Sequence, residues 1–122
     1  MILVDTSVWI DHLRRGNARL AGMLQDGVVV SHPFIIGELA CGAMRQRAAI
    51  LSLLAELPVT TTATHGEALA FIEARRLMGR GLGYIDVHLL AAASLDRLAL
   101  WTLSRRLDVA AKALGVSRSE AS

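Results

Sequence analysis

The 122-residue sequence contains one cysteine, two prolines and one lysine, and only 4% of its residues are Phe, Trp or Tyr. The single cysteine, Cys41, excludes a disulfide within the chain and favours a reducing compartment. Because aromatic residues are few while hydrophobic residues make up 53% of the chain, the core must be built from Leu, Ala, Val and Ile.

Long hydrophobic runs are absent as well. No apolar stretch approaches the roughly 20 residues that a membrane-spanning helix requires. The N-terminus has no basic leader and its apolar run stops at Asp5, so we expect neither a secretion signal nor a membrane association, and we predict a cytoplasmic protein. A chain of 122 residues can bury one core but not two, which predicts one domain over residues 1–122.

Neither sign of charge is in large excess, because 13 Lys and Arg residues face 11 Asp and Glu residues, for a net charge of +2. This balance does not by itself indicate a nucleic-acid partner. The cations are nearly all arginines, and six of them form adjacent pairs: Arg14-Arg15, Arg75-Arg76 and Arg105-Arg106. Guanidinium groups suit phosphate geometry, but solvated helix faces account for such pairs equally well.

Short apolar or β-branched runs alternate along the chain with segments of helical periodicity. We expect strands at residues 1–4, 28–31, 59–62 and 98–102. We expect helices at residues 8–13, 20–24, 34–44, 48–57, 67–78, 85–95 and 106–114. Strands that alternate with helices predict right-handed crossovers and a parallel sheet covered on both faces.

Three acidic residues stand where solvated residues are not expected. Asp5 ends the first apolar run, at the end of a strand where open α/β sheets place their ligands. Glu38, in FIIGELACG, has apolar residues three and four positions away, so we expect it on an apolar helix face. Asp86, in GYIDVHLLAAAS, lies at the start of an apolar helix. Because an isolated buried carboxylate is costly, a shared Mg²⁺ or Mn²⁺ would account for all three.

Structural roles are the alternative for these residues. Asp5 can cap the helix that begins at Thr6, and Asp86 can stabilise a helix N-terminus. Glu38 lies well inside its helix and has no such role. We interpret three histidines as structural residues rather than ligands, and expect the last of them to be hydrogen-bonded: His32, His65 and His88.

Four motifs in order, LVDTSVWI, HPFIIGELACG, GLGYIDVHLLAAA and LALWTLSRRL, resemble those of PIN-domain ribonucleases of the VapC toxin type. The resemblance covers nearly the whole chain. It implies an α/β fold, an α/β/α sandwich around a central parallel sheet of four to five strands. It further implies a Mg²⁺-dependent endoribonuclease whose products carry a 5′-phosphate and a 3′-hydroxyl. Such a toxin of a type II toxin-antitoxin system would be inhibited by a VapB-type antitoxin and would form a homodimer.

The resemblance also assigns roles to individual residues. It implies that Asp5, Glu38 and Asp86 are catalytic and bind the metal, Mg²⁺ or Mn²⁺. The supporting residues that it implies are Thr6, Ser7, Thr102 and Ser104. The residues expected to contact substrate phosphates are Arg80, in a loop with Gly79, Gly81 and Gly83, together with Arg105 and Arg106.

One position departs from the family pattern. Many relatives carry a fourth acid where this chain has Ser104, which supplies no charge but can hold a water molecule. Asp108, one helical turn later, is the alternative source of a fourth carboxylate, but we favour its interpretation as an exposed helix residue. The departure bears on a second metal ion rather than on the first.

Two rival functions use similar chemistry. A response-regulator receiver also gathers acids and Mg²⁺ at strand ends, but it requires adjacent acids after the first strand and a lysine after a late strand. Here Asp5 precedes Thr and Ser, and the sole lysine, Lys112, lies inside the last predicted helix. The second rival is a PIN module that binds RNA or a partner without cutting, and the serine at position 104 favours it. The sequence does not identify the RNA that is cut.

Overall fold

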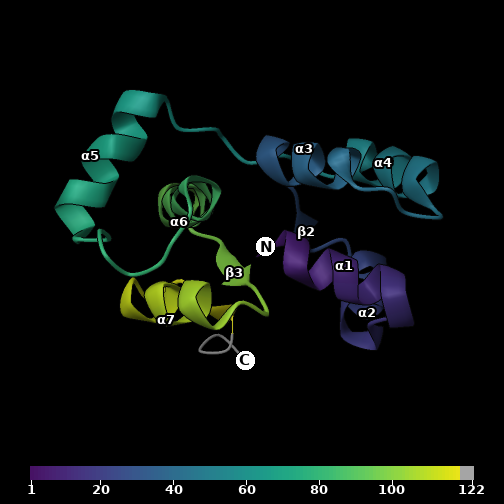
Figure 1. Cartoon of the computed structure of the whole chain (residues 1–122). Helices are drawn as coiled ribbons and strands as arrows, with labels where there is room; N and C mark the ends of the chain where they lie inside the picture. Colours follow the sequence, from purple (N-terminus) through teal and green to yellow (C-terminus); the bar gives the residue numbers. More distant parts are fainter. Residues whose placement is uncertain (119–122) are drawn as a thin grey trace.

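Three short parallel strands lie between two layers of helices in the computed structural model of the chain, which describes residues 1–118 (Figure 1). The last four residues of the predicted domain, 119–122, lie outside the described residues. The strands are β1 (Ile2–Val4), β2 (Val29–Val30) and β3 (Ala99–Trp101), in the order β2-β1-β3. Leu3 pairs with Val30 on one side and with Leu100 on the other. The first strand of the sequence is therefore the central strand.

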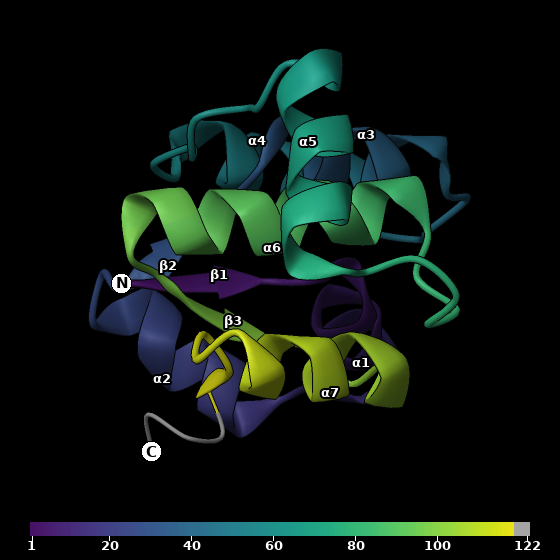
Figure 2. The ribbon, with the colours of Figure 1, turned by 90° about the vertical axis from the view of Figure 1, so that its left-hand side faces the viewer.

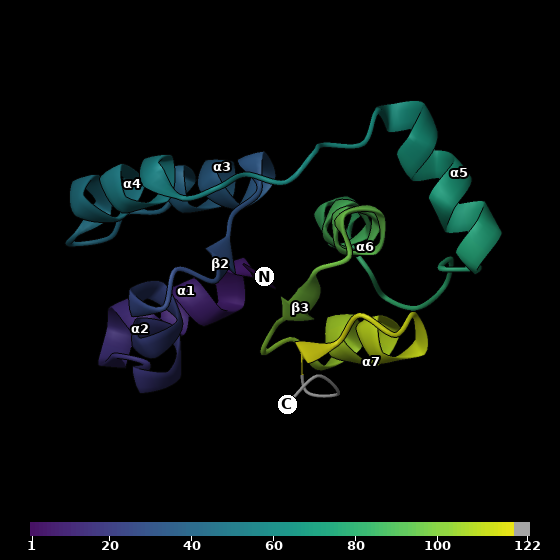
Figure 3. The same cartoon turned by 180° about the vertical axis from the view of Figure 1, so that it is seen from behind.

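The helices form one layer on each face of this sheet (Figure 2). One face is covered by α3 (Pro33–Cys41), α4 (Arg47–Glu56), α5 (His65–Arg75) and α6 (Tyr84–Asp96). The other face is covered by α1 (Thr6–Arg15), α2 (Ala18–Gln25) and α7 (Arg105–Ala113). Figure 3 shows the same two groups of helices from behind. The predicted α/β/α sandwich with a parallel sheet is confirmed.

The predicted strand number of four to five is not found in residues 1–118, where three strands are present. Residues 59–62 form only one isolated bridge, in which Val59 pairs in parallel with Ser31. β2 ends at Val30 and α3 begins at Pro33, so the extended chain beyond β2 is too short to pair with more of residues 59–62. At the opposite edge, a second isolated bridge joins Leu100 to Ser117. The sheet is thus extended at each edge by a single residue pair.

The core is aliphatic, as the composition predicts, apart from the fully buried Trp9 of α1. The segment of α6 from position 87 to position 93 is buried throughout, which places its alanines in the core. In the part of the chain that the structure describes, no helix is both long and apolar enough to cross a membrane.

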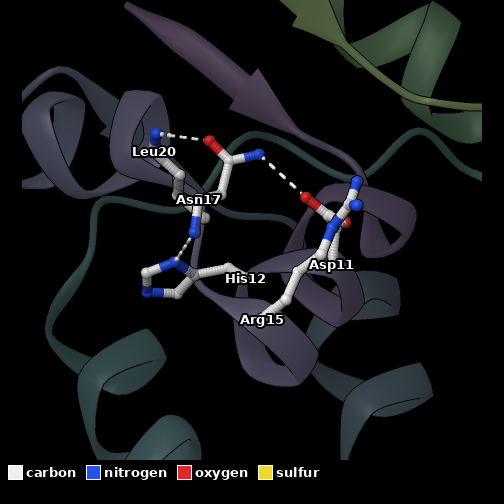
Figure 4. A network of polar contacts seen from close by, with 5 residues as sticks. All are labelled: Asp11, His12, Arg15, Asn17 and Leu20. Carbon is white, nitrogen blue, oxygen red and sulfur yellow. Dashed lines mark hydrogen bonds and ion pairs between the residues drawn. The ribbon is translucent and has the colours of Figure 1, made fainter.

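A hydrogen-bonded network fixes the junction of α1 and α2 (Figure 4). Asn17 caps α2, since its Oδ1 accepts from the backbone N–H of Leu20 at 3.0 Å, and its Nδ2 donates to Asp11 Oδ2 at 3.1 Å. Asp11 also accepts from Nε of Arg15 at 2.6 Å. The hydrogen bonds from Arg15 and then Asn17 lower the pKa of the Asp11 carboxyl. Asp11 therefore has a structural role.

The ends of several elements converge on one side of the sheet. Because the strands are parallel, their carboxyl ends lie at the same edge. The N-terminal ends of α6 and α7 lie on that side too, at the right of Figure 2. Asp5 follows β1 directly and Thr102 follows β3 directly. This edge therefore brings together side chains that are far apart in the sequence.

Candidate active site

Asp5 lies between the end of β1 and the start of α1, and it is only 7% exposed. Its side chain makes no capping hydrogen bond to α1. Instead, Oδ2 accepts from the hydroxyl of Ser7 at 2.7 Å and from the hydroxyl of Thr102 at 2.8 Å. Its backbone N–H donates to the carbonyl of Trp101 at 2.9 Å, which fixes the residue beside β3. Asp5 thus occupies the N-cap position of α1, but its carboxylate does not cap the helix.

The two hydroxyl groups that bind Asp5 are themselves oriented by backbone donors. The N–H of Leu103 donates to Ser7 Oγ, and the N–H of Ser104 donates to Thr102 Oγ1, both at 3.0 Å. A hydroxyl that accepts from a backbone N–H still has one proton to donate, and here the carboxylate takes it. Ser7 and Thr102 are thus positioned to hold Asp5 in one orientation.

Glu38, on α3, is linked to α1 by a hydrogen bond from the hydroxyl of Thr6. Thr6 Oγ1 donates to Glu38 Oε1 at 2.7 Å. The prediction that Glu38 shares an apolar helix face is wrong, because its side chain is exposed and the buried residues of α3 are Ile35 and Leu39. α3 is apolar at most positions, so its periodicity does not identify the face that packs on the core.

Asp86 lies in the first turn of α6 and is partly buried. Its Oδ2 accepts from the backbone N–H of Gly83 at 2.9 Å. One of its two carboxylate oxygens therefore stabilises the N-terminus of α6, as the structural alternative for Asp86 predicts. The start of α6 is held against the start of α3 by the rings of His88 and Phe34, whose centroids are 4.7 Å apart.

The donor chemistry of these residues fits a hard divalent cation, because carboxylate and hydroxyl oxygens are the ligands that Mg²⁺ and Mn²⁺ prefer. Within residues 1–118, however, no three His, Cys, Asp or Glu side chains lie close enough together to hold a metal ion as they stand. Asp5 is fixed and buried, whereas Glu38 is exposed and Asp86 is partly buried. Joint coordination of one ion by these three carboxylates therefore requires a rearrangement of their side chains.

Ser104, at the position of the missing fourth acid, is the N-cap of α7, and its Oγ accepts from the N–H of Leu107 at 3.4 Å. Asp108 does not replace that acid. Its carboxylate accepts from the hydroxyl of Ser117 at 2.8 Å and pairs with Lys112 Nζ at 3.2 Å. These partners hold both of its oxygens, so the alternative of an inward-reaching ligand is not found, and the residue is partly buried rather than exposed.

Arg106, in the first turn of α7, lies directly against the backbone of Gly81. A Cβ atom at Gly81 would stand 2.8 Å from Nη1 and 2.9 Å from Cδ of Arg106, and the φ of Gly81 is +73°. A Cβ atom there would force the Arg106 side chain to shift, and the positive φ strains any residue other than glycine. Sequence reasoning identified Arg106 but not the role of Gly81, although a glycine among three in one loop was the available signal. Arg80 and Arg105 are exposed, and their contact with phosphates stays a prediction.

His32 and His88 are both buried, in agreement with their interpretation as structural residues. His32 Nδ1 accepts from the N–H of Phe34 at 3.0 Å and so caps α3. The hydrogen bond expected for His88 is not found, since neither of its ring nitrogens has a partner in the part of the chain described. His88 is held by ring contacts instead.

The stability of the fold should decrease as the pH falls below about 6.5. Burial, and then the neighbouring His88, lower the pKa of His32 to about 4 from an ordinary value of 6.5. Between these values the unfolded chain binds a proton that the folded chain does not, so the contribution of His32 is complete above pH 6.5 and is lost toward pH 4. Urea unfolding over this pH range measures the effect. His32→Asn, which can still cap α3, should weaken the pH dependence, and an unchanged dependence would contradict the assignment.

Comparisons with known proteins relate the chain to one family. Residues 2–113 match the family profile described as PIN domain. The chain is 48% identical over 121 residues to Ribonuclease VapC32 from two strains of Mycobacterium tuberculosis, covering 98% of each protein. Two solved structures are similar in fold. The crystal structure of PAE2754 from Pyrobaculum aerophilum has a TM-score of 0.62 and 19% identity, covering 99% of this chain and 90% of the other. That of FitAcB from Neisseria gonorrhoeae has a TM-score of 0.64 and 18% identity, covering 96% and 95%.

Proposed function

This chain belongs to the PIN-domain family, and we propose that it is a Mg²⁺-dependent endoribonuclease, the toxin component of a type II toxin-antitoxin system. The resemblance to VapC-type PIN ribonucleases that the four motifs indicate is confirmed by the family match and by the 48% identity to a VapC ribonuclease. The proposed substrate, cellular RNA, implies action in the cytoplasm.

The observation that carries the proposal is the environment of Asp5. Its carboxylate is nearly buried at the end of the central strand, yet it neither caps α1 nor pairs with a cation among the described residues. Two hydroxyl groups from different elements hold it in place. A buried carboxylate without a charged partner is costly. A bound divalent cation accounts for its retention.

We assign the metal ion, Mg²⁺ or Mn²⁺, to Asp5, Glu38 and Asp86. When bound, the ion supplies a Lewis acid that activates water and offsets charge on the scissile phosphate. Ser7 and Thr102 orient Asp5, and Thr6 orients Glu38.

Residues of α7 and of the loop before α6 support substrate binding. Ser104 fixes Thr102 through its backbone N–H and caps α7. Arg106, seated on Gly81, binds a phosphate of the RNA, and Arg80 and Arg105 extend this cationic surface. A nuclease of this kind requires no nucleophilic side chain.

A groove between α1 and the end of α3 suits the antitoxin that the family resemblance implies. Its volume is about 920 Å³, and Glu38 forms part of its wall. The remaining wall combines apolar and cationic side chains: Ile10, Leu13, Leu39, Met44, Arg14 and Arg45. A VapB-type segment with apolar and acidic side chains fits this lining, and at Glu38 it can present a basic side chain to the acids.

We also propose a homodimer, as in the family. The alanine-rich segment of α6 is buried in the core, so it does not supply the interface. Exposed apolar residues elsewhere supply apolar surface instead: Leu69, Leu95, Leu103 and Val109. Sedimentation of the purified protein measures its oligomeric state.

The proposal is tested by incubating the purified protein with total cellular RNA and Mg²⁺ or Mn²⁺. We expect discrete products with 5′-phosphate and 3′-hydroxyl ends, which disappear when EDTA removes the metal and when the cognate antitoxin is added. Mapping the ends of the products identifies the RNA that is cut. Cleavage that persists in EDTA would exclude the metal mechanism.

A second candidate is a PIN module that binds RNA without cutting it. Two observations favour it, namely the serine at position 104 and the lack of a three-residue metal cluster within residues 1–118. RNA binding without any metal-dependent product in the same assay would establish this function in place of the nuclease.

A further inference from the structure

Five rings form a continuous series of contacts from the start of α3 across α6 to α5: His32, Phe34, His88, Tyr84 and His65. The rings of His32 and His88 are buried, whereas Tyr84 is 42% exposed. All five Phe, Trp and Tyr residues of the chain lie within residues 1–118, and Tyr84 alone among them is classed as exposed. Next to the exposed His65, Tyr84 is thus the one ring of these five aromatic residues that is exposed at the surface.

The ring of Tyr84 is held in place from two helices. Its hydroxyl oxygen is hydrogen-bonded to Nδ1 of His65 on α5, at 2.7 Å. The ring of His88 contacts it in a T-shaped arrangement, with centroids 4.6 Å apart and planes at 78°. The ring of His65 is tilted by 53° at 5.6 Å. Neither neighbour stacks in parallel on Tyr84, so aromatic surface is left for a further ring, and the fixed orientation lowers the entropy cost of using it.

The position of Tyr84 relates it to the proposed active site. It is the first residue of α6, two residues before Asp86. It also follows directly the loop in which Gly81 carries the side chain of Arg106. Residues 81–84 therefore have the guanidinium of Arg106 at one end, where it can bind a phosphate, and the exposed ring of Tyr84 at the other, where it can stack on a base.

We propose that Tyr84 is a stacking platform for an unpaired nucleobase of the bound RNA, an inference that rests on the proposed ribonuclease function. Proteins that bind single-stranded RNA combine cationic side chains on the backbone with aromatic rings on the bases. Every base has a π-face, so Tyr84 contributes affinity for unpaired RNA. His65 is the positioning residue, since it acts through the Tyr84 hydroxyl.

The test uses full-length protein carrying Asp5→Asn, so that the RNA stays intact, and a short unstructured oligoribonucleotide containing one 2-aminopurine. Binding should quench the 2-aminopurine fluorescence through stacking on Tyr84. Tyr84→Leu, which keeps an apolar side chain but no π-face, should weaken binding about 5- to 100-fold and abolish the quenching. Tyr84→Phe keeps the ring, and we expect it to retain the quenching with a smaller loss of affinity.

Urea unfolding of the same variants separates stacking from a structural role. A structural role predicts that losses of affinity follow losses of stability, whereas stacking predicts that they follow the presence of a ring. The proposal is overturned if Tyr84→Leu binds and quenches like its parent, or if the parent shows no quenching. In either of those cases, metal-dependent cleavage by the unmodified protein would still support the proposed nuclease, so the two failures are distinguishable.

Discussion

Asp5→Asn should reduce metal-dependent RNA cleavage by about three orders of magnitude. A metal ion contributes several kcal/mol to stabilising the transition state, and each ~1.4 kcal/mol corresponds to tenfold in rate. The amide has nearly the shape of the carboxylate and can still accept from Ser7 or Thr102, so we expect the fold to persist. It lacks the charge that retains the cation. Initial cleavage rates at saturating Mg²⁺, measured beside urea unfolding, give both quantities.

Asp11→Asn is the matched control for this substitution. It makes the same chemical change on α1, but Asp11 belongs to the network with Arg15 and Asn17 at the junction with α2. We expect a modest loss of stability and a cleavage rate within about twofold of the parent, because exposed ion pairs contribute little. Equal rates for Asp5→Asn and the unmodified protein would remove Asp5 from the site and make the non-cutting PIN module the better account.

Gly81→Ala should lower kcat/KM for RNA about 10- to 100-fold, the range expected when a charged group loses its hydrogen bond to phosphate. The new Cβ would collide with Arg106, 2.8 Å from Nη1, and would displace the guanidinium. The backbone at Gly81, with a φ of +73°, adds a strain of about 1–2 kcal/mol for any residue with a Cβ. Cleavage assays and urea unfolding separate the two effects.

Gly79→Ala provides the comparison that isolates Arg106. Gly79 has the same φ of +73°, but a Cβ built there meets nothing within 4 Å. The two alanine variants should therefore lose similar stability, and only Gly81→Ala should lose much activity. Arg106→Ala should reproduce the loss, and adding Gly81→Ala to it should have little further effect on cleavage, since the two changes remove one contact. Additive losses would show that Gly81 acts independently of Arg106.

Local patterns predicted much of this molecule. The apolar run before Asp5 predicted the first strand, and the helix expected from residue 34 begins at Pro33. The helices expected at residues 8–13 and 20–24 are separated at Gly16, which has a φ of 75°, and at Asn17, whose side chain caps α2. Each of these features depends on a few residues that are neighbours in the sequence, and so it can be predicted from the local sequence pattern.

Contacts between distant segments were not predictable in the same way. The exposure of Glu38 depends on its position beside Thr6, 32 residues earlier. The strand expected at residues 59–62 depends on how much of β2 is available as a partner, and β2 has only two residues. The contact of Arg106 with Gly81 joins a helix to a loop that periodicity does not describe. Each of these features is set by packing between elements, which a one-dimensional pattern does not specify.

The hydrogen bond between Thr102 and Asp5 spans 97 residues. During translation, Asp5 is therefore synthesised long before Thr102, whose hydroxyl binds it. Likewise, β1 is synthesised long before β3, with which it pairs. Such distant pairings form late, because much of the chain must be ordered before they can close. An unfinished chain on the ribosome consequently lacks the arrangement that we assign to RNA cleavage. The topology thus places the completion of this arrangement after the synthesis of Thr102.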